Sequence, residues 1–310
     1  MPDKPSVTAS DARLAGSCMG TLLQTWEEVL IGFPAGDSMH ARETASQRQL
    51  GTSRLSDPVN QISGYAHTAG LVALNHLTVV RESLVSYSNG MGTCPVSAVD
   101  TLTRVAVETY AVQCWIVDPT ITMRERYARW LCLETMSERS SWAALHEGEP
   151  HSQNPALVAL AEDADRHGVE RDPKMTWIGV HPPKALDLTG ELISRFSAYE
   201  PGRLSTEDGE RYGRLMYRLM SGGVHANVGH VLLSLGPAGP DEDGIPSYTY
   251  SLSTGRLWRS LATTILASFA AGCEYAAWVG RPVPDEARRL TVHHFDLAAA
   301  RVNEAEPAGG

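Results

Sequence analysis

Four polar residues follow one another along an otherwise apolar segment at intervals of about one helical turn. Arg214, Arg218, Ser221 and His225 are spaced by four, three and four residues. On a helix these spacings place the side chains in one stripe, because each residue turns by about 100°. The stripe predicts a site in which His225 is the general acid or base and Arg218 and Ser221 bind the substrate. The alternative is a surface edge with one core histidine.

A second group of polar residues lies on the segment 95–118, which is apolar around nearly its whole circumference. Arg104, Glu108 and Trp115 share one narrow face of this predicted helix. Arg104 and Glu108 are four residues apart and can form an ion pair. A buried ion pair stabilises a fold less than hydrophobic packing does, so its presence on a central helix favours a function. We expect Glu108 to be catalytic, Arg104 to bind substrate and Trp115 to form an apolar wall. The alternative is an internal strut between two helices.

The segment 122–146 adds cations near the start of a predicted helix. Arg126 and Arg129 share a face with Trp130. Because arginines near a helix N-terminus oppose the helix dipole, they need a carboxylate partner or an anionic ligand. We expect Arg126 to hold an anionic group of the substrate and Trp130 to line the same pocket. The alternative is pairing with acidic residues across the core.

Helix start and stop signals are frequent along the chain, whereas strand signals are few. Capping residues, glycines and prolines predict helices over 10–30, 57–89, 95–118, 122–146, 154–167, 207–235, 254–279 and 285–302. Only the runs 175–180 and 248–252 alternate in a way that is typical of strands. These signals predict an all-α fold, a bundle of about seven to nine helices.

The same signals predict a single helical domain over 11–303, with disordered ends over 1–10 and 304–310. Two long irregular loops are expected, over 168–205 and 236–253. Loops of this length in a compact domain are usually functional. We expect the first to cover a pocket walled by the helices 95–118, 122–146 and 207–235.

Composition excludes several classes of protein. The chain has 310 residues with 26 Lys+Arg and 36 Asp+Glu, and a net charge of −10 is unusual for a nucleic-acid coat protein. No apolar run approaches the roughly 18 residues that a membrane helix needs, and residues 1–10 lack the features of a signal peptide. We therefore expect a cytoplasmic protein without a membrane partner.

Metal and cofactor motifs are absent from the sequence. The five cysteines form no C-x-x-C pair, which argues against a zinc cage. His225 and His230 are five residues apart, which is about 140° around a helix and unfavourable for binding one ion. A phosphate-cradling glycine loop is also missing. We expect no metal and no cofactor.

The segment from Arg218 to His225 resembles the R-x4-6-H signature of HEPN-type helical proteins. That resemblance implies a metal-independent ribonuclease, with His225 acting on the ribose 2′-hydroxyl, Arg218 on the phosphate, and two chains joined at this edge. More loosely, the run 105–129 together with 217–225 resembles a group of uncharacterised all-helical bacterial proteins. This second resemblance implies a fold and no activity.

Three functions follow from these patterns. The first is a helical enzyme or ligand-binding protein that acts on a small anionic organic molecule by acid/base chemistry, in specialised metabolism. The second is a HEPN-like ribonuclease or a relative that only binds RNA. The third is a non-catalytic subunit of a heteromeric complex, with the polar stripe recognising the partner protein. The acidic composition favours the first of the three.

Overall fold

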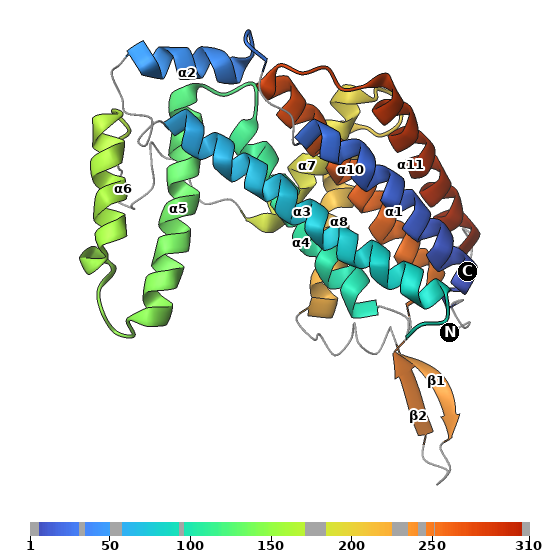
Figure 1. The fold of residues 1–310 in the computed structure, drawn as a ribbon. Helices are drawn as coiled ribbons and strands as arrows, with labels where there is room; N and C mark the ends of the chain where they lie inside the picture. Colours follow the sequence, from blue (N-terminus) through green and yellow to red (C-terminus); the bar gives the residue numbers. More distant parts are fainter. Residues whose placement is uncertain are drawn as a thin grey trace.

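The computed structural model describes residues 6–30, 35–49, 58–92, 96–170, 184–224, 235–240, 246–250 and 252–305. Within these ranges the chain forms ten α-helices, one short 3₁₀ helix and one pair of antiparallel strands (Figure 1). The predicted all-α class is therefore confirmed, with a helix count slightly above the expected seven to nine.

Most elements follow one another with short connections. In chain order they are α1 (Ala9–Leu30), α2 (Met39–Gln49), α3 (Pro58–Ser88), α4 (Val96–Val117), α5 (Met123–Leu145), the 3₁₀ helix η2 (His151–Gln153), α6 (Pro155–Arg166), α7 (Ala185–Tyr199), α8 (Thr206–Val224), β1 (Leu235–Pro240), β2 (Pro246–Tyr250), α10 (Thr254–Val279) and α11 (Asp285–Ala305).

Capping chemistry fixes several of these boundaries. The Thr122 side chain accepts a hydrogen bond from the backbone N–H of Glu125 and so begins α5. Ser253 begins α10 in the same way, by accepting from the N–H of Arg256. Gly280 ends α10 at a φ of 71°, a conformation that glycine adopts without steric strain. The sequence therefore predicts the start and the end of α10 to the residue.

Helix α10 is the centre of the bundle. Nearly all of its residues are buried, and it packs against α1, α4, α7 and α11. Its aromatic residues Trp258, Phe269 and Trp278 are fully buried in the core. Helices α2, α5 and α6 lie to one side of this bundle, and the β1–β2 hairpin projects away from it (Figure 1). The bundle thus leaves α2, α5 and α6 as a separate edge of the molecule.

The structure corrects the two predicted irregular loops. The first contains α7, whose residues Leu188, Leu192 and Phe196 are buried against the core. Helices α7 and α8 also approach closely, because a Cβ atom on Gly213 would lie 2.6 Å from the carbonyl oxygen of Thr189. Residues 185–199 of the loop that was expected to cover a pocket therefore form a core helix. The second predicted loop contains the β1–β2 hairpin, with Leu235 paired to Tyr250.

Other boundaries differ from the expectations in smaller ways. Helix α2 was not predicted, because its sequence is almost wholly polar. Helix α8 is described only to Val224, and Leu235 belongs to β1 rather than to a helix. The predicted strand over 175–180 lies outside the described residues.

The N-terminal segment differs as well, because residues 6–10 are not a disordered end. The backbone N–H of Val7 donates to the carbonyl of Leu252 at 3.0 Å, and Val7 is buried. Across the described ranges, no helix combines the length and the apolar character needed to cross a membrane.

Candidate functional site

Arg104 and Glu108 form the ion pair that their spacing predicts, and they connect α4 to α8. The Arg104 Nε atom lies 2.8 Å from Glu108 Oε1. The same guanidinium donates through Nη2 to the Tyr217 hydroxyl at 3.2 Å and lies over the Tyr217 ring. Burial disfavours the charged guanidinium, but the hydrogen bond and charge of Glu108 outweigh it and raise the pKa of Arg104. Glu108 is therefore held at one oxygen by a permanently charged partner.

Glu108 also lines a cavity between α3 and α4. The cavity has a volume of about 350 Å³, near the lower end of the range typical of small-molecule sites. Its lining residues are Tyr65, Thr68, Ala69, Val72, Glu108, Thr109 and Val112. Among these, Glu108 alone carries a charge, and Arg104 is the partner of its carboxylate among the described residues. A carboxylate of known orientation thus faces mostly apolar walls.

Tyr65 supplies a hydrogen-bond donor to the same cavity. Burial raises the pKa of the Tyr65 phenol, and the negative charge of Glu134 on α5 raises it further. The phenol therefore stays protonated at neutral pH. The cavity is thus lined by a phenol on α3 and a carboxylate, Glu108, on α4, together with the hydroxyl-bearing Thr68 and Thr109.

Of the predicted stripe, the described residues Arg214, Arg218 and Ser221 lie on α8 and do not line this cavity. Ser221 is partly buried, and its Oγ atom has no hydrogen-bond partner among the described residues. Arg218 is exposed, and its neighbours Leu215 and Leu219 are 52% and 37% exposed. His225 lies outside the described residues, so its predicted catalytic role stays a prediction.

Arg126 forms an internal cross-link between α5 and α2. Its side chain has 0% exposure and donates to the carbonyl oxygens of Ile116 and Asp118 at 2.8 and 2.9 Å. Its Nε atom lies 3.4 Å from Oε1 of Glu43 on α2. Because the guanidinium is enclosed by protein groups, we do not place Arg126 at a substrate site. The sequence alternative named Asp100, Glu108 or Asp118 as the acidic partner, but the carboxylate that Arg126 pairs with is Glu43.

The two tryptophans predicted to line the pocket occupy separate places. Trp115 is buried beneath the guanidinium of Arg129, at 5.2 Å from the ring centre. Trp130 stacks on Tyr127 with ring centres 5.4 Å apart. Neither lines the cavity at Glu108. The structure brings Arg104 and Glu108 together with α8, and it does not bring Arg126, Trp115 or Trp130 to them.

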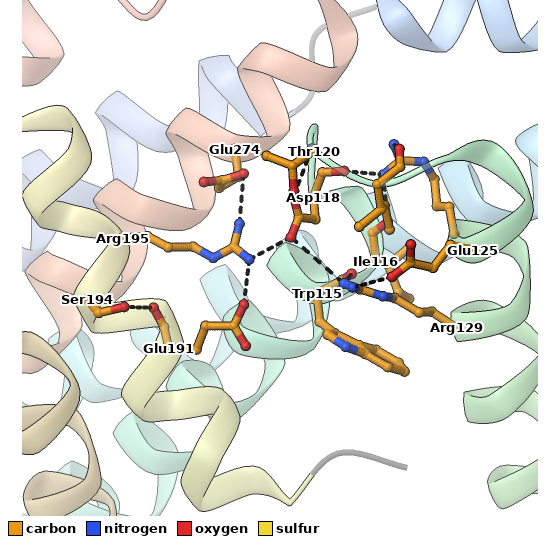
Figure 2. A network of polar contacts seen from close by, with 12 residues as sticks. Trp115, Ile116, Asp118, Thr120, Glu125, Arg129, Glu191, Ser194, Arg195 and Glu274 are labelled. Atoms are coloured by element: carbon orange, nitrogen blue, oxygen red, sulfur yellow. Dashed lines mark hydrogen bonds and ion pairs between the residues drawn. The ribbon is translucent and has the colours of Figure 1, made fainter. Parts of the chain in front are cut away.

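A buried ionic cluster at the junction of α4, α7 and α10 was missed in the sequence. Arg195 Nη2 lies 2.7 Å from Asp118 Oδ2 and 2.6 Å from Glu191 Oε1, and Arg195 Nη1 lies 3.1 Å from Glu274 Oε2 (Figure 2). Burial opposes ionisation of Asp118, but hydrogen bonds from Arg195 and Thr120 outweigh it and lower the pKa of Asp118 to about 2. The cluster joins three helices through charged groups that are all engaged.

One signal in the sequence pointed to this cluster. Glu274 lies in the middle of α10, a helix that is otherwise apolar or neutral from Leu261 to Val279. A single carboxylate in such a helix needs a cation from another element. Its partner Arg195 could not be identified, because it lies in the segment that was predicted to be a loop.

The described residues contain no group of three or more His, Cys, Asp or Glu side chains arranged to hold a metal ion. Comparison of the chain with family models, curated proteins and solved structures finds no match. A function for this protein can therefore be inferred only from the geometry of its sites.

Proposed function

We propose that this protein binds a small organic molecule in the cavity between α3 and α4 and uses Glu108 as a proton acceptor. The observation that carries this proposal is the position of Glu108, with Oε1 held by Arg104 at 2.8 Å at the edge of a cavity of about 350 Å³. A general base needs a fixed position within hydrogen-bond reach of the proton that it takes, and the bond to Arg104 fixes this carboxylate at the edge of the cavity.

The lining of the cavity indicates the character of the ligand. The lining residues are three aliphatic residues, two threonines, one tyrosine and one glutamate. Because Arg104 is engaged by Glu108 and Tyr217, the proposed ligand is an uncharged or cationic molecule with an apolar body and an acidic O–H or N–H group. The anionic ligand expected from the number of arginines is not the class proposed for this cavity.

A fragment screen tests the proposal without knowledge of the natural ligand. Fragments with an aromatic or aliphatic body and one amine, amide or hydroxyl group are titrated while backbone NMR signals of the protein are recorded. We expect shifts at Thr68, Ala69 and Thr109. Val112→Trp fills the cavity and should weaken these fragments by about tenfold or more.

The matched control for the filled cavity is Val79→Trp. Val79 lies on α3, the other helix that forms the cavity, is 47% exposed and does not line the cavity. This variant should bind as the wild type does. Equal affinity of wild type and Val112→Trp would reject the cavity as the binding site.

Glu108→Gln separates the effect of the carboxylate charge on binding from the effect of the cavity's shape. The amide keeps the size of the side chain but loses the charge and half of the acceptor capacity. We expect fragments with an amine or hydroxyl donor to lose about tenfold in affinity, and purely apolar fragments to bind unchanged. An equal loss for both kinds of fragment would contradict the proposed role of the carboxylate.

A second candidate function is a HEPN-like ribonuclease, and the surface of α8 favours it. Arg218 is exposed between Leu215 and Leu219, which are themselves exposed, as at an edge where two chains would meet. The test is cleavage of a single-stranded RNA of mixed sequence in the presence of EDTA. Arg218→Ala should abolish cleavage, whereas the exposed control Arg211→Ala should not. Absence of cleavage by the wild type rejects this candidate.

A further inference from the structure

A second cavity lies at the edge formed by α2, α5 and the end of α6, on the side of the bundle seen at the left of Figure 1. Its volume is about 410 Å³. The lining residues are Arg42, Glu43, Pro58, Met123, Arg124, Tyr127, His167 and Val169. No lining residue is shared with the cavity at Glu108, so this site is independent of the function proposed above.

His167 contributes a buried imidazole nitrogen without a partner. The side chain is 8% exposed, and its Nδ1 atom lies 2.8 Å from the carbonyl oxygen of Asp163. A carbonyl can only accept, so in the neutral ring Nδ1 carries the proton and Nε2 carries a lone pair. That Nε2 atom is shielded from solvent and has no hydrogen-bond partner among the described residues. A buried acceptor of this kind indicates a missing donor.

The neighbours of His167 hold the ring in place and are themselves satisfied. The Tyr127 hydroxyl donates to Asp163 Oδ2, and the Tyr127 ring meets the imidazole edge to face at 5.1 Å. Burial raises the pKa of Tyr127, and the hydrogen bond to Asp163 raises it further, so the phenol remains a donor. Arg166 pairs with the other oxygen of Asp163 at 2.9 Å. Among the described residues, none of these neighbours has a donor left for Nε2 of His167, so a molecule in the cavity is a source for the missing donor.

The cavity also has an excess of positive charge. Arg42 and Arg124 line it and are exposed at its rim. Glu43 is the acidic lining residue, but it is matched by the buried guanidinium of Arg126 at 3.4 Å and accepts from Trp278 Nε1 at 3.3 Å. Asp163 is matched by Arg166. Arg124 Nη2 donates to the carbonyl oxygen of Gly168, which carries no net charge, so no acidic group among the described residues matches the charges of Arg42 and Arg124, and they can attract an anion.

Arg126 connects this cavity to the core. It lies between Glu43 on α2 and the carbonyl oxygens that end α4, and it also contacts Met39. The short, polar helix α2 is thereby fixed to the bundle, and Arg42 is carried by it. The arginine that was predicted to bind an anion is thus placed behind the residues that can do so.

We propose that this cavity binds a small anion that also carries a hydrogen-bond donor, such as a phosphate monoester, a hydroxy acid or inorganic phosphate. The anionic oxygens of the ligand accept from Arg42 and Arg124, and its donor bonds to Nε2 of His167 after a small movement of the ring, because this atom has almost no accessible surface in the unliganded chain. This arrangement satisfies the unpartnered nitrogen and the unmatched charge at once. A single ligand would therefore bond to the acceptor on His167 and to the two cations, Arg42 and Arg124.

A comparison of inorganic phosphate with sulfate separates the hydrogen bond to His167 from the attraction of an anion by the arginines. At pH 7.5 phosphate keeps a P–OH group, whereas sulfate has the same shape and charge class without a proton to donate. Calorimetric titration of the full chain should show phosphate binding about tenfold tighter than sulfate. Equal binding of the two ions would mean that His167 accepts nothing from the ligand, and the proposal would be overturned.

Two variants test the residues. His167→Asn keeps a donor that can reach the carbonyl of Asp163 but removes the Nε2 acceptor, so it should abolish the preference for phosphate over sulfate. Arg42→Gln should weaken both ions by about tenfold at low salt. The control Arg211→Gln, an exposed arginine on α8, should change neither.

Circular dichroism melting of each variant checks that it folds. A folded His167→Asn that still prefers phosphate contradicts the role of the imidazole. Folded Arg42→Gln with unchanged affinity for both ions contradicts the cationic rim.

Discussion

At the scale of single residues, the buried and half-buried titratable groups divide into those that protein partners fully engage and those that line a cavity. Arg126 and Arg195 donate to several protein acceptors each. Glu108 and His167 instead line cavities, and the proposals above assign one atom of each to a ligand. Stabilising ion pairs and functional groups therefore have the same residue types, and their surroundings distinguish them.

The low pKa of Asp118 predicts how the free energy of unfolding changes in acid. Its pKa in the folded protein is about 2, below the ordinary value near 3.9, so its ionised form stabilises the fold above about pH 4. This contribution is lost as the pH falls from about 4 through 2. We expect Asp118→Asn to lower the free energy of unfolding at pH 7 by about 3 kcal/mol, because Arg195 loses a partner.

Urea unfolding at pH 7, 4 and 3 measures this effect. The difference between wild type and Asp118→Asn should narrow as the pH falls below 4, since protonation removes the same charge from the wild type. The exposed Asp165→Asn is the control and should stay within about 0.5 kcal/mol of the wild type. A difference that does not change with pH would contradict the assigned interaction.

The sequence predicts the interaction partner of a residue only where the two are close along the chain. The spacing of Arg104 and Glu108 placed both on one face of α4, and their ion pair is confirmed. Arg126 was recognised as unusual, but its partner Glu43 lies on α2, a helix with too few apolar residues to be recognised. For His167 the sequence indicates only the end of a helix. Its surroundings depend on contacts with Tyr127 and Asp163, and the contact with Tyr127 comes from another helix.

At the scale of elements, the contact between α1 and α10 is set by a glycine. A Cβ atom on Gly272 would lie 2.1 Å from Cε3 of Trp26, whose side chain has no exposed surface. The tryptophan ring has no room to move in a close-packed core. We expect Gly272→Ala to lower the free energy of unfolding by about 2 kcal/mol or more, measured by urea unfolding.

Gly64→Ala is the matched comparison. Gly64 lies inside α3, and a Cβ atom there would meet no other atom within 4 Å. Alanine is the better helix former, so this variant should raise the free energy of unfolding by about 0.5 to 1 kcal/mol. Similar effects of the two substitutions would show that α1 and α10 do not meet as described.

The elements themselves were predictable where capping residues and apolar periodicity agree. Both hold for α3, α5 and α10, which begin and end within one or two residues of the predicted positions. Helix α7 has the periodicity in Leu188, Leu192 and Phe196, but Pro182 and Pro183 before it and Gly190 within it are typical of loops. The close contact with α8 explains Gly190 only once the fold is known.

At the scale of the whole molecule, the two cavities lie in different parts of the structure. One is between α3 and α4, and the other is at the edge of α2, α5 and α6. Because they share no lining residue, ligands should bind to them independently. We expect Val112→Trp to leave the phosphate affinity unchanged and His167→Asn to leave fragment binding unchanged, both measured by calorimetry. A change of more than about threefold in either would indicate coupling between the sites.

The overall architecture was predictable as a class but not as an arrangement. Helical periodicity and the scarcity of strand signals predicted an all-α fold. Which helices meet was not predictable, because long-range contacts leave no local pattern. The expected convergence of three helices on one pocket is replaced by a pair, α4 with α8, joined by Arg104 and Tyr217.

The most direct test of the central claim is a crystal structure of the full chain soaked with the fragments that contain an amine or hydroxyl group. The account predicts a fragment between α3 and α4, with its donor within about 3.2 Å of the Glu108 carboxylate and its apolar part against Ala69 and Val112. Fragments that leave this cavity empty while occupying other surfaces, or that bind there away from Glu108, would contradict it.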